Sequence, residues 1–458
     1  MCIEQLKKLV CPFCAGSLEV EHRIESPTRP GFHGVVRCSC RRWPVTHNIL
    51  NFGGKHGFAV DRAVAFLLAD DVDGATAVQL ETETLRTTLP GRIVRKLSQW
   101  GFAGDRVVSW YRLRTAPRLL DAGSFAEAVS MVDEGSFGQY LRHRYSLPSF
   151  HAALPMCTML RTLSPGSILD LGCGAGHYTV VLRHLFPEAE YTGIDQHYAN
   201  LLLGQLFLTP TDDLYICINL KHPPPVRDCA FDLMFASDIL HTLSIGSTAA
   251  QRYMARVTAK GVVYSARFDH CWGKEFAFPP TDHPNVLPNG ANVLLDEHQV
   301  ITQAHSEENL SVTSLAAATT PETCRSYCLL SSPELDVMTL ESSDHPQLPA
   351  RVLHNWCISP CFEEIASENG NRRFALRNEL PIPQTDEWRH SVKPLAPKDL
   401  DIPEKHMSGL TVDRKYPGLP DLIRSHAVCF QPPRYADPED SGPPPPTPSA
   451  TPSGGATQ

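Results

Sequence analysis

SILDLGCGAGHYT, residues 167–179, is the most informative segment of the chain. Its first residues predict a short buried strand that ends near Asp170, and three glycines follow at alternate positions, Gly172, Gly174 and Gly176. The next residues, YTVVLRHLF, place apolar side chains at helical intervals. Glycine lets the backbone turn sharply and approach a ligand closely, and a helix N-terminus presents N–H groups without intrahelical partners. The stretch therefore predicts a ligand-binding loop between a strand and a helix.

The residues around this loop alternate between strand and helix patterns. Strands are expected at EYTGID, LYICINL, FDLMFAS and KGVVYSARF, with a helix at YANLLLGQLFL between the first two. Alternation at this spacing indicates parallel strands joined by crossover helices, which is a doubly wound α/β sheet. Asp195 closes the second strand, 21 residues after Gly174, where a carboxylate can accept both hydroxyls of a ribose. The GxGxG spacing differs from the dinucleotide-binding fingerprint, and no GK[ST] of a phosphate-binding loop follows. Another kind of nucleotide-binding α/β unit remains an alternative interpretation.

Together, the loop, Asp195 and the stretch FDLMFASDILH resemble the class I S-adenosylmethionine-dependent methyltransferases, over about residues 150 to 270. The resemblance implies a Rossmann-like sheet of seven strands. It also implies that Asp170 and the backbone of the three glycines hold the methionine end of S-adenosylmethionine, and that Asp195 holds the ribose. Asn219 and Leu220 stand where the family has Asp-Ala beside the adenine, and an Asn oxygen can still accept the amine hydrogen bond. Ser237, at the end of the fourth strand, completes the cofactor-binding set.

Catalytic candidates follow the fourth strand. A sulfonium is an activated leaving group, so the enzyme mainly positions the acceptor and supplies a base where the acceptor carries a proton. His241 and Asp238 occur where a doubly wound sheet presents its ligand crevice, and His177 is expected on the same rim. A packing role at a helix start is the alternative for His241.

Four cysteines near the N-terminus form two close pairs, Cys11-Pro-Phe-Cys14 and Cys38-Ser-Cys40. Two tight turns with two thiolates each are typical of a structural zinc ribbon. His47 is an alternative ligand, and unrelated free thiols are the alternative interpretation. The stretch also resembles a bacterial zinc-ribbon family related to the activator subunit of tRNA and release-factor methyltransferases, in which an aromatic-Pro-Val turn, here Trp43-Pro44-Val45, follows the second pair.

Two further features stay open on the sequence alone. Cys324/Cys328 and Cys357/Cys361 have i,i+4 spacing that would place the sulfurs of each pair on one helix face, as a second metal site or as buried thiols. Between Arg86 and Arg118, eight Lys and Arg residues are interleaved with aromatic residues and one acid. This mixture suits RNA binding, a solvated helix face, or a lid over a small-molecule pocket.

Composition divides the chain into four regions. We expect a zinc ribbon at 1–54, a helical connector or cap at 55–150, the methyltransferase domain at 151–380 with its cofactor half at 151–272, and an extended Pro-rich region with a disordered tail at 381–458. The helices of the connector are expected at AVDRAVAFLLADD, RIVRKLSQWGF, SFAEAVSMV and SFGQYLRHRY, which have apolar residues at intervals of three and four. The last strands of the domain are expected at LDVMTLES and RRFALRNEL, with PARVLHNWCISPCFEEIASE as a helix between them.

Charge and hydropathy limit the functional classes. No apolar run reaches the roughly 18 residues of a membrane span, and the N-terminus lacks the pattern of a signal peptide, so we expect a soluble, cytoplasmic protein. Forty-one Lys and Arg against 50 Asp and Glu give a net charge of −9, which argues against nucleic acid as the main partner. The favoured function is methyl transfer to a small organic molecule. The alternatives are RNA base methylation, as in the zinc-ribbon ribosomal RNA guanine methyltransferases, and a non-catalytic partner-binding module. The oligomeric state stays unknown.

Overall fold

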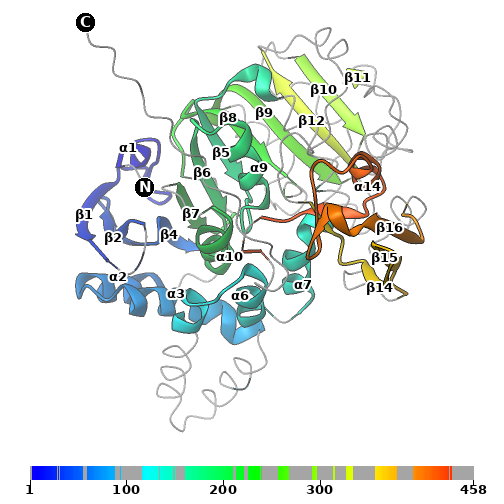
Figure 1. The fold of residues 1–458 in the computed structure, drawn as a ribbon. Coiled ribbons are helices and arrows are strands. Elements are labelled where there is room, and N and C mark those ends of the chain that lie inside the picture. Colours follow the sequence, from blue (N-terminus) through cyan, green and yellow to red (C-terminus); the bar gives the residue numbers. More distant parts are fainter. Residues whose placement is uncertain are drawn as a thin grey trace, which may run out of the picture.

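The structure is a computed structural model of the 458-residue chain. It describes residues 3–27, 29, 31–54, 59–87, 93, 116–133, 135–147, 150, 160–209, 213–220, 225–237, 239, 256–267, 291–296, 313–314, 326–333, 356–378, 396–432 and 434–435. Among these residues no helix combines the length and the apolar character needed to cross a membrane. Figure 1 shows a large central sheet with the N-terminal elements on one side and the C-terminal elements on the other.

The central sheet has twelve strands in the order β1-β2-β3-β4-β7-β6-β5-β8-β9-β12-β10-β11. It is therefore larger than the expected seven strands. The strands of the N-terminal half are β1 (Glu19–Ile24), β2 (His33–Arg37), β3 (Arg42–Thr46) and β4 (Ile49–Gly54). The others are β5 (Ser167–Leu171), β6 (Glu190–Asp195), β7 (Leu214–Ile218), β8 (Phe231–Ala236), β9 (Thr258–Arg267), β10 (Ala291–Asp296), β11 (Thr313–Ser314) and β12 (Ser326–Ser332).

The strands β5 to β9 form the doubly wound part that the alternating pattern predicts. They are parallel, and β5 lies between β6 and β8, so the strand order reverses beside β5. The helices between them are α9 (His177–Leu185), α10 (Tyr198–Leu203) and a π-helix, η4 (Gly204–Leu208). Ligands of doubly wound sheets bind outside the carboxyl ends of the strands at such a reversal, and the glycine loop follows β5 at this point.

Period-two alternation divides the core between the two faces of the sheet. In β7, Tyr215 and Cys217 pack in the cluster that contains α9 and α10, whereas Leu214 and Ile216 pack in the cluster on the other face. That second cluster includes Leu6, Leu9 and Trp43, and the first of these belongs to the short helix α1 (Ile3–Leu6). The N-terminal segment therefore helps to bury one face of the sheet.

The expected boundary at residue 54 lies inside one continuous sheet. β4 pairs in parallel with β7, through partners such as Leu50 and Ile216, so the first four strands cover what would otherwise be an exposed sheet edge. Trp43, Pro44 and Val45 lie within β3 and do not form the expected turn. The turn comes next, at His47 and Asn48, which both have positive φ as a two-residue hairpin requires.

Three of the expected helices between residues 55 and 150 are present. They are α2 (Val60–Leu68), α6 (Phe125–Val132) and α7 (Ser136–His143), and α3 (Val72–Thr87) lies between the first two. Short 3₁₀ turns follow at η2 (Arg144–Ser146) and, before β5, at η3 (Leu160–Leu163). The helix expected at RIVRKLSQWGF and most of the basic stretch from Arg86 to Arg118 lie outside the described residues.

The helix expected between residues 349 and 368 is wrong. The described part consists of two strands, β13 (Trp356–Ile358) and β14 (Phe362–Glu368), and β14 pairs with β15 (Asn371–Leu376). Asn369 and Gly370, with positive φ, make the tight turn between them, and an Asn-Gly pair is a strong hairpin signal that the helical reading overlooked. Cys357 lies in β13 and Cys328 in β12, so neither pair of cysteines shares a helix face. The strand expected at RRFALRNEL is confirmed by β15, and the one at LDVMTLES lies outside the described residues.

The region beyond Leu380, expected to be extended, is folded between residues 396 and 432. Its elements are β16 (Asp399–Pro403), η12 (Glu404–His406), β17 (Met407–Ser408), β18 (Thr411–Val412), α14 (Leu419–Arg424) and β19 (Val428–Phe430). β13 lies between β18 and β19, and β16 pairs with β15. Side chains such as Ile402 and Val428 are fully buried, which an extended tail would not achieve. The disordered tail, expected at SGPPPPTPSATPSGGATQ (441–458), lies outside the described residues.

Candidate functional site

The glycine loop between β5 and α9 has the backbone that only glycine adopts readily. Gly172, Gly174 and Gly176 have φ of +72°, +58° and +80°. The N–H groups of Gly172 and Cys173 both donate to the carbonyl oxygen of Ile194, at 2.7 and 3.1 Å. The N–H of Gly176 donates to Cys173 O at 2.9 Å. The loop is therefore held to the end of β6 by its own backbone.

The surroundings of Gly172 and Gly174 differ sharply. A Cβ atom added at Gly172 would lie 2.3 Å from Cγ1 of Ile239, so the segment after β8 packs directly on the loop. A Cβ atom added at Gly174 would meet no atom of the described residues within 4 Å. Gly174 thus borders open space at the carboxyl ends of the parallel strands, where a ligand can approach the backbone.

Asp195, the last residue of β6, connects that strand to the loop. Its Oδ2 accepts from the N–H of Gly174 at 3.2 Å, and its Oδ1 accepts from the N–H of His197 at 2.8 Å. The side chain is buried. A carboxylate has about four lone-pair positions, so an aspartate can accept from backbone N–H groups and from hydroxyl groups.

Asp170, near the end of β5, lies beneath the loop in a fully buried network. Its Oδ2 accepts from the hydroxyl of Tyr191 at 2.5 Å, and the hydroxyl of Thr179 lies 3.4 Å away. Burial raises the pKa of Asp170 to about 7, although the hydrogen bonds from Tyr191 and Thr179 lower it. Sequence reasoning missed Tyr191 and Thr179 as supports of the loop, because no local pattern relates them to Asp170.

His177 is not on the rim where a base was expected. It is the first residue of α9, its side chain is buried, and Nε2 lies 3.1 Å from the carbonyl oxygen of Leu141. Burial, followed by the positive charge of Arg144, lowers the pKa of His177 to about 3. An imidazole in this position has a packing role and cannot reach a substrate.

The structure describes three of the remaining residues that were expected at the site. Asn219 and Leu220 follow β7, with the first half-buried and the second buried, and Ser237 follows β8 and is half-buried. All three lie just beyond the carboxyl ends of strands that neighbour or flank β5 and β6. Asp238 and His241, the catalytic candidates, lie outside the described residues.

The four N-terminal cysteines come together at the other end of the sheet. The sulfur atoms of Cys11, Cys14, Cys38 and Cys40 all lie within 4.8 Å of one another. Two of the separations are 3.6 Å, between Cys11 and Cys40, and 3.3 Å, between Cys38 and Cys40. Tetrahedral zinc with Zn–S bonds of about 2.3 Å requires S···S distances of about 3.8 Å. The donor set and its spacing fit one zinc ion.

The chain around this cluster forms two turns on an aromatic support. The N–H of Phe13 points to Cys11 Sγ at 3.5 Å, and the ring of Phe13 stacks on that of Trp43 at 5.5 Å. The hydroxyl of Ser39 donates to Cys14, whose pKa is lowered to about 6 chiefly by this contact. His47, the alternative ligand, is instead fully buried in the β3–β4 turn with its ring 4.9 Å from that of His33.

Sequence comparison identifies the segment that contains the glycine loop. Residues 169–265, from β5 to β9, match the methyltransferase-domain family. Trans-aconitate 2-methyltransferase of Yersinia pseudotuberculosis is 31% identical over 100 residues, which are 22% of this chain and 37% of that protein. Malonyl-[acyl-carrier protein] O-methyltransferase of Legionella pneumophila is 32% identical over 79 residues, which are 17% of this chain and 28% of that protein. The chain thus spans about a third of the length of these relatives.

Similar solved structures include further methyltransferases. The plantazolicin methyltransferase BamL, in complex with a triazolic desmethylPZN analog and SAH, has 12% identity and a TM-score of 0.31, with 47% of this chain and 97% of that chain covered. The methyltransferase domain of bacterial-CtHen1-CN has 12% identity and a TM-score of 0.29, with 40% and 99% covered.

Proposed function

We propose that this protein is an S-adenosylmethionine-dependent methyltransferase that acts on a small organic molecule. The observation that carries the proposal is the glycine loop after β5, which lies in the segment that matches the methyltransferase-domain family and leaves open space beside Gly174. Asp195 stands at the end of the next strand, and its carboxylate accepts from the N–H of Gly174 in the loop.

The bonding of the loop favours this cofactor over a phosphate. A phosphate-binding loop directs several free N–H groups at the anion. Here the N–H groups of Gly172, Cys173, Gly174 and Gly176 are already bonded within the protein. A ligand at Gly174 therefore lies beside the carboxylate of Asp195 and not in a ring of free N–H groups, which suits the ammonium and sulfonium groups of S-adenosylmethionine.

In this proposal each predicted residue keeps a distinct role. The loop backbone and the Asp170 network would shape the methionine end of the site, and Asp195 would accept the ribose hydroxyls. Asn219 and Leu220 would line the adenine side, with Ser237 opposite at the end of β8. Asp170 would act through Tyr191 and the loop, because its carboxylate accepts from the hydroxyl of Tyr191 beneath the loop.

S-adenosylmethionine supplies a methyl group that the positive charge of its sulfonium has already activated. The chain has to bring the acceptor atom into line and exclude water. Where the acceptor carries a proton, we propose His241 as the base and Asp238 as its neighbour, because both follow β8 directly. The acceptor, oxygen or nitrogen, is left open.

A single structural zinc ion is part of the proposal. It would be held by Cys11, Cys14, Cys38 and Cys40, whose spacing fits a tetrahedral site. Since β4 pairs with β7, the metal would stabilise the same sheet that carries the cofactor loop.

The charges of the N-terminal region favour a small substrate over RNA. Every Lys and Arg described among residues 1–54 has a carboxylate partner. The pairs are Lys7–Glu4, Lys8–Glu190, Arg23–Glu25, Arg29–Asp73, Arg37–Glu19, Arg41–Asp61 and Arg42–Glu21. Four of these acids belong to the same region and three to α2, α3 and β6, so the basic residues are largely neutralised before any phosphate arrives.

Two glycine variants test the site. Gly174→Ala adds a Cβ into open space at a cost of about 1–2 kcal/mol for the left-handed backbone, and should abolish S-adenosylmethionine binding in calorimetry while the chain stays folded. Gly172→Ala has the same backbone cost, and its Cβ would also collide with Ile239. This variant should therefore have a lower unfolding temperature than the parent protein. Unchanged cofactor binding by Gly174→Ala would refute the proposed site. Absence of binding by the parent protein would favour the non-catalytic module.

The substrate class needs a separate measurement. Small-molecule and RNA extracts from cells with and without the protein should be compared by mass spectrometry for a difference of one methyl group. A methylated small molecule supports the proposal, and a methylated RNA base would overturn the substrate class while keeping the reaction.

A further inference from the structure

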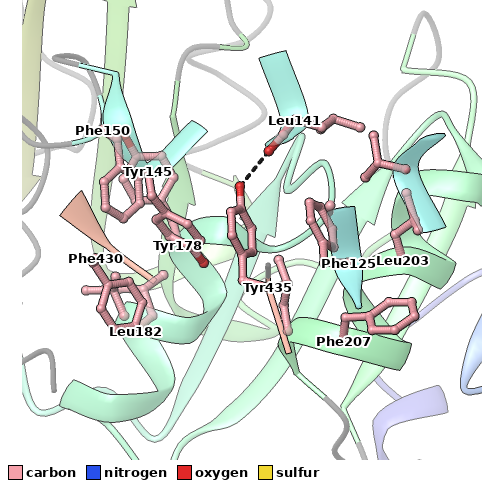
Figure 2. Close-up of a cluster of buried hydrophobic side chains, with 14 of the residues drawn as sticks. Phe125, Leu141, Tyr145, Phe150, Tyr178, Leu182, Leu203, Phe207, Phe430 and Tyr435 are labelled. Atoms are coloured by element: carbon pink, nitrogen blue, oxygen red, sulfur yellow. Dashed lines mark hydrogen bonds between the residues drawn. The ribbon is translucent and has the colours of Figure 1, made fainter. Parts of the chain in front are cut away.

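Residues 434 and 435 lie more than 250 positions from the glycine loop in sequence, yet they contact α9, which follows the loop, and the π-helix η4, which packs against it. Their backbone carbonyls accept from the first turn of α6: the N–H of Phe125 donates to Arg434 O at 2.7 Å, and that of Ala126 to Tyr435 O at 2.9 Å. The ring of Tyr435 stacks on that of Phe125 at 4.8 Å, and Figure 2 shows both rings side by side. This segment is therefore docked by its main chain and by its side chains.

Tyr435 reaches the element on the C-terminal side of the loop. Its hydroxyl donates to the carbonyl oxygen of Leu141 at 2.6 Å, the contact dashed in Figure 2, and lies 3.2 Å from Nε2 of His177. His177 begins α9 directly after Gly176. The hydroxyl of Tyr145 also donates to the carbonyl oxygen of His177, at 3.2 Å. The first residue after the loop is thus fixed through Tyr435, Leu141 and Tyr145.

Arg434 reaches the element that supports the loop from behind. Its guanidinium lies 4.8 Å from the ring centre of Phe207 and donates to the carbonyl oxygen of Leu206 at 3.3 Å. Both belong to the π-helix η4, whose first residue, Gly204, packs on the loop so closely that a Cβ there would lie 2.6 Å from the carbonyl oxygen of Ala175. Ala175 stands between Gly174 and Gly176. π-helical turns are often found at functional sites.

We propose that Arg434 and Tyr435 are positioning residues for the cofactor loop, an inference that rests on the proposed function. Tyr435 fixes where α9 begins and Arg434 fixes the π-helix, so that one dipeptide braces both sides of the loop. Neither side chain touches the open space at Gly174. Their effect on the cofactor is through the conformation of residues 172–176.

The test uses the full-length protein and the variant Tyr435→Phe, which keeps the stacking on Phe125 and removes the hydroxyl. Tyr416→Phe is the matched control, because Tyr416 lies in the same C-terminal region with its ring 5.2 Å from that of His406, away from the loop. Three quantities are measured for each variant: hydrogen exchange of the peptides that cover residues 170–180 and 204–208, the affinity for S-adenosylmethionine, and the temperature of thermal unfolding.

Loss of one hydrogen bond corresponds to about a 3- to 10-fold effect. Tyr435→Phe should speed exchange in the loop peptide by about that factor and weaken the cofactor by a similar factor, with turnover at saturating cofactor unchanged. The second variant, Arg434→Ala, changes an exposed side chain and should speed hydrogen exchange at residues 204–208. It tests the proposal independently if Tyr435→Phe does not fold. Tyr416→Phe should change neither measurement.

Two outcomes would overturn the proposal. Unchanged exchange of the loop in both variants would show that the segment does not brace it. A uniform increase of exchange across the chain, in proportion to the lowered unfolding temperature, would show a merely structural role. If the parent protein binds no S-adenosylmethionine, the proposed function fails, and exchange of the unliganded loop still decides the role of Arg434 and Tyr435.

Discussion

Replacing Asp170 by asparagine should change how the stability of the protein depends on pH. Asp170 is fully buried, and its pKa is raised from 3.8 to about 7, chiefly by burial. A raised carboxylate pKa means that the folded chain binds a proton more tightly than the unfolded chain. The cost of ionising Asp170 is therefore absent below about pH 4, grows as pH rises, and is fully present above about pH 7.

Linkage gives the size of this cost. With the two pKa values above, the folded state loses about 2 kcal/mol at pH 5 and about 4 kcal/mol at pH 8, as an upper limit for a single group. Asparagine does not titrate, and its side-chain oxygen can still accept from the hydroxyl of Tyr191. The stability of Asp170→Asn relative to the parent should thus rise by about 2–3 kcal/mol between pH 5 and pH 8.

Urea unfolding followed by circular dichroism at both pH values measures this difference. Tyr191→Phe is the companion variant: it removes the hydrogen bond that lowers the pKa of Asp170, so the fall in stability should extend to higher pH than in the parent. A free-energy difference between Asp170→Asn and the parent that is the same at pH 5 and pH 8 would refute the reasoning.

Three other expectations concern the cofactor, the metal and the reaction. Asp195→Ala should weaken S-adenosylmethionine binding by about 1.5–3 kcal/mol per lost charged hydrogen bond, and equal affinity in calorimetry would remove the residue from the site. Elemental analysis should find one zinc per chain. The variant Cys14→Ser should lose the zinc and unfold at a lower temperature. The control variant Cys229→Ser should keep the zinc, because Cys229 is an exposed cysteine outside the cluster. His241→Ala should lower turnover by about 10²–10⁴-fold at nearly unchanged cofactor affinity if the acceptor must lose a proton. A small effect would indicate an acceptor that is already unprotonated, and a variant that does not fold would indicate packing.

Local patterns were enough to predict the cofactor half of the fold. The glycines at alternate positions after SILDL require a turn with positive φ, and the structure has that turn at Gly172, Gly174 and Gly176. The strands at EYTGID and FDLMFAS follow from short apolar runs between helical patterns, since the parallel strands β6 and β8 are buried on both faces. Cys11-x-x-Cys14 and Cys38-x-Cys40 likewise predict a cluster, because each pair needs only one tight turn.

Contacts between distant segments decided the rest. Nothing in the residues of β4 indicates that Leu50 pairs with Ile216, and this pairing merges the N-terminal region with the sheet. His177 has the spacing of a rim residue, and only the docking of Tyr435 shows that it is buried.

The C-terminal region gives the physical reason most clearly. Its residues favour turns and extended chain locally, and Trp356–Ile358 becomes a strand because Val412 and Phe430 pair with Trp356 from more than 50 residues away. Burial against remote partners outweighs weak local preference, so sequence periodicity could not predict where residues 396–435 would fold. Residues 167–176 were enough to predict the loop and its positive-φ turn, whereas the contacts that hold the loop in place come from residues far away in the sequence.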